Sequence, residues 1–205
     1  MKKIHLCSAF AILLMFAGNA FADTITYTES ATATGTLGAN SFTDALITLS
    51  FTGNTANVSE GPLFVLINNP GPDAVTLTVA GLGTSTFTDD IYVFVNVFVN
   101  RLGVLKIGDA GFSDEAIPAD ILDTENTAFQ NYFLATAIGP VSGTSLINEG
   151  SDFSTTDGTF NIDSIDGDST FTATLGTPPV PEPSSILLLG TGLLGAGALR
   201  RKLIA

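Results

Sequence analysis

The sequence has almost none of the residue types that build most enzyme and metal sites. Its 205 residues include one histidine, one cysteine and no tryptophan. His5 and Cys7 both lie in the first ten residues, in a segment that we expect the mature protein to lose. A chain without imidazole or thiol cannot build a Ser-His-Asp or Cys-His catalytic site, a His/Cys zinc site or a disulfide. We therefore predict that the protein is not an enzyme and is stabilised by packing and hydrogen bonding.

Basic residues are also scarce, which limits the partners that the chain can bind. Residues 23–179 hold 19 acidic and two basic residues, Arg101 and Lys106, a net charge of −17. Only 13% of the whole chain is charged, about half the usual share, so Thr, Ser, Asn and Gly must cover much of the surface. A domain this acidic repels nucleic acid and anionic lipid. We expect no nucleic-acid partner.

The first 22 residues have the pattern of a secretory signal peptide. A positive start with Lys2 and Lys3 precedes a short apolar run, and Ala20 and Ala22 form an Ala-x-Ala cleavage site. We expect signal peptidase to cut before Asp23. An uncleaved membrane anchor is the less favoured alternative, because the apolar run is shorter than the ~20 residues that span a bilayer.

The C-terminal end predicts a short transmembrane helix. An apolar stretch at residues 186–199 is followed by the basic cluster Arg200, Arg201 and Lys202. Fourteen residues span about 21 Å as a helix, less than the ~30 Å hydrocarbon core, so the anchor is weak. The basic cluster favours a cytoplasmic end, which places the preceding domain outside. A buried amphipathic helix is disfavoured because the stretch is apolar on all sides.

A proline-rich linker precedes this helix. Pro178, Pro179, Pro181 and Pro183 fix their φ angles and favour extended conformations in the residues before them. Residues 177–183 are therefore expected to be exposed, stiff and extended. A protease can recognise such a segment without unfolding the domain.

The linker and the tail together resemble a known sorting signal. Val180-Pro181-Glu182-Pro183, the glycine-containing apolar segment and Arg200-Arg201-Lys202 are similar to the PEP-CTERM sorting signal of Gram-negative bacteria. The resemblance implies recognition by an exosortase, a membrane cysteine transpeptidase that removes the tail near the triplet. It also implies a precursor held transiently in the inner membrane, and a mature protein at the outer surface or in the extracellular, biofilm-type matrix. Such proteins usually accompany exopolysaccharide production.

The central part of the chain alternates apolar and polar residues with period two. For example, Ile47, Leu49 and Phe51 fall on one face of a strand, and Thr48 and Ser50 fall on the other. Strands are predicted at residues 24–34, 45–52, 63–68, 75–79, 85–88, 91–99, 132–138, 159–163 and 170–175. The strand at 91–99 is apolar on both faces and belongs inside a sandwich. Residues 120–130 form either the only helix or a loop.

These strands predict an all-β domain, an antiparallel, jelly-roll-like β-sandwich, because the pattern has no βαβ rhythm. The predicted organisation is a cleavable signal helix (1–22), a β-sandwich ectodomain (23–176), a Pro-rich linker with the Pro-Glu-Pro motif (177–183) and a transmembrane sorting helix with a basic end (184–205).

Carboxylates are the only remaining groups for site chemistry. Asp163, Asp166 and Asp168 lie in a short segment that could hold Ca²⁺ through oxygen ligands, although it lacks the regular spacing of an EF-hand loop. Solvated turn acids are the simpler interpretation. A second group is interpreted as a charged loop and comprises Asp114, Glu115, Asp120, Asp123 and Glu125.

The sequence favours a structural or interaction protein of the matrix, which binds exopolysaccharide or copies of itself. A carbohydrate-binding, lectin-like module, with or without Ca²⁺, is the alternative. The absence of Trp leaves Tyr27, Tyr92 and Tyr132 as the possible stacking platforms, and these are better explained as core or edge residues. A glycoside hydrolase that uses two carboxylates is the least favoured function.

Overall fold

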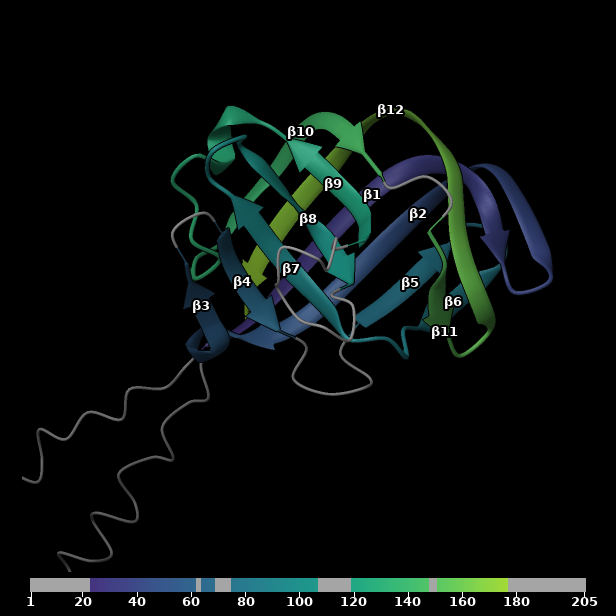
Figure 1. Cartoon of the computed structure of the whole chain (residues 1–205), viewed down its shortest axis with the longest axis horizontal. Helices are drawn as coiled ribbons and strands as arrows, with labels where there is room; N and C mark the ends of the chain where they lie inside the picture. The colour runs from purple at the N-terminus through teal and green to yellow at the C-terminus, as the bar shows by residue number, and fades with distance from the viewer. Residues whose placement is uncertain (1–22, 62–63, 69–74, 107–118, 148–150, 177–205) are drawn as a thin grey trace, which may run out of the picture. The chain divides into compact units, whose positions relative to one another are not determined.

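The structure is a computed structural model that describes residues 23–61, 64–68, 75–106, 119–147 and 151–176 (Figure 1). These residues belong to one unit with a shared hydrophobic core. The predicted signal peptide, Pro-rich linker and sorting helix all lie outside the described residues. Within the described ranges, no helix is both long and apolar enough to cross a membrane.

The described residues form strands and two short 3₁₀ helices. The strands are β1 (Thr24–Leu37), β2 (Asn40–Asn54), β3 (Val58–Glu60), β4 (Phe64–Asn68), β5 (Val75–Val79), β6 (Gly83–Thr86), β7 (Ile91–Asn96), β8 (Arg101–Lys106), β9 (Ala119–Glu125), β10 (Ile138–Leu146), β11 (Phe153–Thr155) and β12 (Gly158–Leu175). The 3₁₀ helices are η1 (Thr55–Asn57) and η2 (Thr127–Phe129).

Strands make up 73% of the described residues, and every pairing between them is antiparallel, which confirms the all-β antiparallel class. The predicted jelly-roll-like sandwich would have two separate sheets, but the described strands form one sheet. The strands follow one continuous order, β3-β4-β7-β8-β9-β10-β12-β1-β2-β5-β6, with β11 also paired to β12. This single sheet curls on itself (Figure 1).

Contacts between distant strands show the curl. A Cβ atom at Gly53 in β2 would lie 2.9 Å from Ile67 Cδ1 in β4, although these strands are near opposite ends of the sheet order. At the other end, Phe87 after β6 forms a bridge with Thr155 in β11, and Thr156 N donates to Thr86 O at 2.8 Å. Strands β12, β1, β2, β5, β6 and β11 therefore close into a ring.

Period-two alternation explains why these segments are strands. In β1 the side chains of Ile25, Tyr27, Ala31 and Ala33 are buried, and the Thr and Ser residues between them face outward. β-branched Thr packs well on a pleated surface, so this polar face also favours the strand. Burial of the other face against the shared core fixes the register, because a slip by one residue would expose every apolar side chain.

An aromatic cluster around Phe171 of β12 occupies the centre of the core. Its ring centroid lies 6.0 Å from that of Tyr27, 5.8 Å from that of Phe129 and 6.4 Å from that of Tyr132. The hydroxyl of Tyr27 donates to the backbone oxygen of Leu134. The cluster thus joins β1 and β12 to the segment around η2.

Two strand predictions are wrong at particular residues. The strand predicted at 91–99 ends at Asn96, whose Oδ1 accepts a hydrogen bond from Phe98 N at 3.1 Å and so initiates a turn. Most of the segment predicted at 132–138 is irregular, with Leu134 at φ 58° and Tyr132 Oη donating to Thr136 O at 2.7 Å. In this segment local hydrogen bonds replace a partner strand.

The segment 120–130 is neither a continuous helix nor only a loop. It contains most of β9 and all of η2, and the side chain of Asn126 caps η2 by accepting from Ala128 N at 2.9 Å. Its apolar residues Ile121 and Leu122 lie in β9, which pairs with β8 and β10, and its apolar Phe129 lies in η2.

Candidate functional site: a buried carboxyl cluster and a terminal sorting signal

The predicted processing residues border the folded unit. Ala20, Ala22, the triplet region 180–183 and the basic cluster 200–202 lie outside the described residues. Asp23 is described, and its backbone N donates to Thr55 Oγ1 at 3.1 Å, while its backbone O accepts from Thr55 N at 3.0 Å. The first residue after the predicted signal-peptide cut is therefore already part of the fold.

The other end of the unit is fixed in the same place. Gly176 N donates to Thr24 O at 2.7 Å, just before the predicted linker begins. The two ends of the folded unit lie side by side as a result.

The three aspartates predicted to hold Ca²⁺ lie on one strand. Asp163, Asp166 and Asp168 are all exposed on β12, with Asp166 opposite Thr32 of β1 and Asp168 opposite Thr144 of β10. Within the ranges that the structure covers, no three His, Cys, Asp or Glu side chains are placed to hold a metal ion. The described geometry therefore gives the Ca²⁺ site no support.

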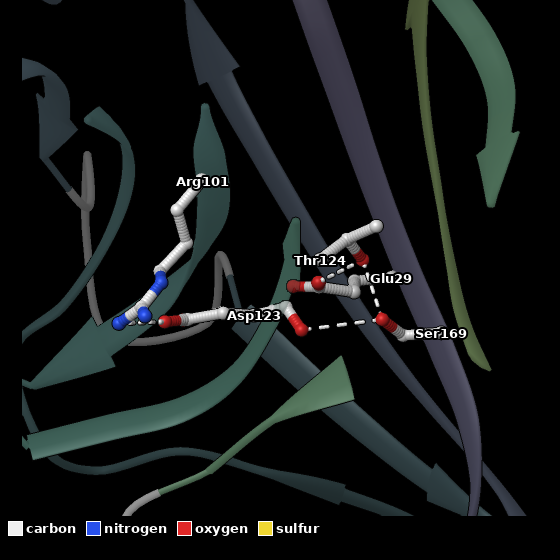
Figure 2. Close-up of polar contacts among 5 residues, drawn as sticks. All are labelled: Glu29, Arg101, Asp123, Thr124 and Ser169. Carbon is white, nitrogen blue, oxygen red and sulfur yellow. Dashed lines mark hydrogen bonds and ion pairs between the residues drawn. The ribbon is translucent and has the colours of Figure 1, made fainter. Parts of the chain in front are cut away.

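A buried polar cluster lies elsewhere, where β1, β9 and β12 meet (Figure 2). Glu29 of β1 is 1% exposed, and Asp123 of β9 is fully buried. Thr124 Oγ1 donates to Glu29 Oε1 at 2.7 Å and lies 2.7 Å from Ser169 Oγ. Ser169 Oγ is also placed to donate to Asp123 O at 3.2 Å. These contacts hold the two acidic residues on one connected network.

Burial raises the pKa of Glu29 well above its ordinary value. The hydrogen bond from Thr124 lowers this pKa and the charge of Asp120 raises it, but both effects are smaller than desolvation. Glu29 Oε2 is buried and has no hydrogen-bond partner among the residues that the structure describes. A buried carboxylate oxygen without a partner is costly, so the neutral acid is the favoured form of Glu29.

Asp123 is also expected to hold a proton. Burial raises its pKa well above the ordinary value, and Asp120 and Glu29, when ionised, raise it further. Arg101 Nη1 lies 3.7 Å from Asp123 Oδ2 and lowers this pKa, but its side chain is partly exposed and the pair is long for an ion pair.

Asp123 Oδ1 and Oδ2 have no hydrogen-bond partner among the described residues, and a bond to the neighbouring carboxyl of Asp120 would require one of the two acids to be protonated. Burial raises the pKa of Asp120, while the charge of Arg101 and the interaction with Asp123 lower it; the same interaction raises the pKa of Asp123, so the proton is favoured on Asp123. The cluster then combines a neutral Glu29, one shared negative charge and the cation Arg101. It is close to neutral overall, which is how a buried group of acids becomes tolerable.

A glycine makes room for this arrangement. Gly103 of β8 pairs with Asp123, and a Cβ atom at Gly103 would lie 2.1 Å from Asp123 Oδ1. Any side chain at this position would displace the carboxyl group.

The sequence interpretation missed Glu29 and assigned Asp123 to a charged loop. One signal was present, because Glu29 is in phase with Ile25, Tyr27 and Ala31 on the inward face of its strand. No comparable local signal identifies Arg101, which reaches Asp123 only through the pairing of β8 with β9.

Comparison with known proteins identifies the end of the chain. Residues 179–202 match the model of the PEP-CTERM protein-sorting motif. The match confirms the resemblance seen in the sequence, and it contains the Pro181-Glu182-Pro183 triplet and the basic cluster. The motif implies an exported protein that an exosortase processes and that is routed to the cell envelope or surface. Searches of curated proteins and of solved structures gave no match.

Proposed function

We propose that this protein is a structural or interaction component of the cell surface or extracellular matrix that accompanies exopolysaccharide. The sorting motif at residues 179–202 carries this proposal, because it directs a precursor to exosortase processing and export. The described unit is then the part of the protein that remains after processing and acts outside the cell.

The position of the folded unit between the two processing signals supports this function. Its first and last hydrogen bonds involve Asp23 and Gly176, so a cut before Asp23 and a cut near Pro181 remove no strand. Processing therefore leaves an intact sheet.

The properties of the unit also suit the outside of a cell. Its stability comes from one large apolar core and a continuous hydrogen-bonded sheet, neither of which depends on a redox state. Glu29 and Asp123, the best candidates for acid and base roles, are closed to solvent in the core and cannot meet a substrate there. We therefore assign the unit a binding or structural role and no catalysis.

Export and processing can be tested together. The gene is expressed in a Gram-negative host that carries an exosortase, and intact mass is measured for protein recovered from the surface and the medium. We expect loss of residues 1–22 and of a C-terminal segment that begins near the Pro-Glu-Pro triplet.

The matched control replaces Pro181, Glu182 and Pro183 with alanine and leaves the helix and the basic cluster unchanged. This variant should remain in the inner membrane with its tail intact. Recovery of the unaltered full-length chain from the cytoplasm, or identical processing of the alanine variant, would contradict the proposal.

A further inference from the structure

The outer face of the sheet carries an ordered array of hydroxyl groups. The strand registers align outward Ser and Thr residues into three rows that run across neighbouring strands, and together we call these rows the hydroxyl face. The first row is Ser142, Thr170, Ser30, Thr48, Thr78 and Thr84; the second is Thr172, Thr28, Ser50, Thr76 and Thr86; the third is Thr174, Thr26 and Thr52.

The rows have regular spacing. Neighbours within a row stand on adjacent strands about 4.8 Å apart, and successive rows lie two residues apart along each strand, about 6.7 Å. Some neighbours bond to each other, with Oγ atoms of Thr78 and Thr84 2.8 Å apart and those of Ser142 and Thr170 2.8 Å apart. All fourteen residues are exposed or partly exposed, so the array is open to a ligand.

The hydroxyl face is uncharged in a strongly acidic domain. Every member is Ser or Thr, and the acidic residues of β12 begin one row beyond it, where Asp168 stands opposite Thr144 and Asp166 opposite Thr32. The surrounding acids repel a polyanion, and the face itself offers a polycation no charged partner, so a polycation would bind the acids and not the rows. The ligand chemistry that remains is neutral and rich in hydroxyl groups, which both donate and accept hydrogen bonds.

The twist of the sheet favours binding of a flexible ligand over a rigid, flat one. Adjacent strands rotate by about 20–25°, so six strands accumulate a rotation on the order of 100°. A flat crystalline surface could touch only a few strands at a time. A single flexible chain can follow the rows over their whole length.

We propose that the hydroxyl face binds an extended chain of a neutral polysaccharide that runs along the rows and across the strands. This inference rests on the proposed role at the cell surface and specifies the partner for it. Each hydroxyl contact replaces a contact with water and adds little alone, so affinity accumulates with the number of sugars bound. The face has no aromatic stacking platform, and monosaccharides should therefore bind too weakly to detect.

The test measures binding of the purified full chain, in detergent, to a linear neutral glucan of graded length and to a polyuronate. The variant Thr48→Val/Thr78→Val removes two hydroxyl groups from the first row and keeps the β-branched shape. Its matched control, Thr36→Val/Thr159→Val, makes the same change on β1 and β12 outside the rows. Thermal melting of all three proteins checks that the fold is unchanged.

We expect affinity for the glucan to rise with chain length and to fall about tenfold in the first variant, from the loss of two hydrogen bonds. The control variant should bind like the wild type, and the polyuronate should bind much more weakly than the glucan. Equal binding of both polymers, equal loss in both variants, or no binding of the longest glucan would overturn the proposal. Because this assay does not depend on export, its result is independent of the processing test.

Discussion

Protonation of Glu29 and Asp123 favours the folded state over the unfolded state. Both are buried acids whose pKa values are raised in the folded protein, so the folded chain holds protons that the unfolded chain releases at lower pH. Folding stability falls with pH wherever the folded state binds more protons than the unfolded state. For these groups, the pH range in which stability falls begins near the ordinary carboxyl pKa, 4.5 for Glu29, and extends up to the raised pKa of the folded state.

The first prediction follows from this sign. The free energy of unfolding should decrease as pH rises from 5 to 8, and Glu29→Gln should remove part of that decrease, because the amide cannot ionise. One proton contributes up to about 1.4 kcal/mol per pH unit within this pH range. Urea unfolding of both proteins at several pH values measures the slope.

The control for this prediction is Asp163→Asn, which neutralises an exposed acid on β12. It should leave the slope unchanged. We compare the slopes and not the stabilities at one pH. The NH₂ group of the new amide lies where Glu29 Oε2 has no hydrogen-bond partner among the described residues, so the substitution also changes stability in a way that does not depend on pH. Identical slopes for Glu29→Gln and the wild type would refute the assignment of a neutral Glu29.

Only part of this cluster was predictable at the residue scale. Strand periodicity alone places Glu29 on the buried face, since it alternates with Tyr27 and Ala31. Its hydrogen bond with Thr124 joins residues 95 positions apart in sequence, and it depends on the strand order. Local patterns contain no information on that order.

At the scale of elements, β12 connects the two parts of the curled sheet. It pairs with β1, β10 and β11, and its Phe171 joins the aromatic cluster. Phe171→Ala should lower the free energy of unfolding by about 3–5 kcal/mol, through lost burial and a residual cavity. Thermal or denaturant unfolding measures this loss.

Phe98→Ala is the matched control, because it deletes the same side chain at a position that is 70% exposed in the β7–β8 turn. It should change stability by less than about 0.5 kcal/mol. Similar losses in the two variants would show that Phe171 does not occupy the centre of the core.

The elements that the sequence predicted correctly share strong alternation, as in β1, β2 and β5. The strand prediction at 132–138 failed because Tyr132 and Leu134 alternate without pairing to a strand: Tyr132 Oη donates locally to Thr136 O, and Leu134 O accepts from the distant hydroxyl of Tyr27. The acidic segment 163–168 has the composition of a loop but lies within β12, because its backbone pairs with the long strand β1. In the acidic segment, long-range pairing overrode composition.

At the scale of the whole molecule, the net charge of −13 should dominate the response to salt. Asp163, Asp166 and Asp168 are exposed and do not gather into a site, so Ca²⁺ should act by screening. The melting temperature should rise equally with Ca²⁺ and Na⁺ at matched ionic strength. A Ca²⁺-specific rise that Asp166→Asn abolishes would instead establish the calcium site.

The hydrogen bond between Gly176 and Thr24 has a mechanical consequence. A pull on the C-terminal end of the unit enters the fold through the last residues of β12, which are bonded to β1 on one side and to β10 on the other. Tension directed along this strand is shared by both ladders at once, because sliding β12 requires many hydrogen bonds to break together. A domain held by its C-terminal end can therefore bear load along its longest strand before any part of the sheet opens.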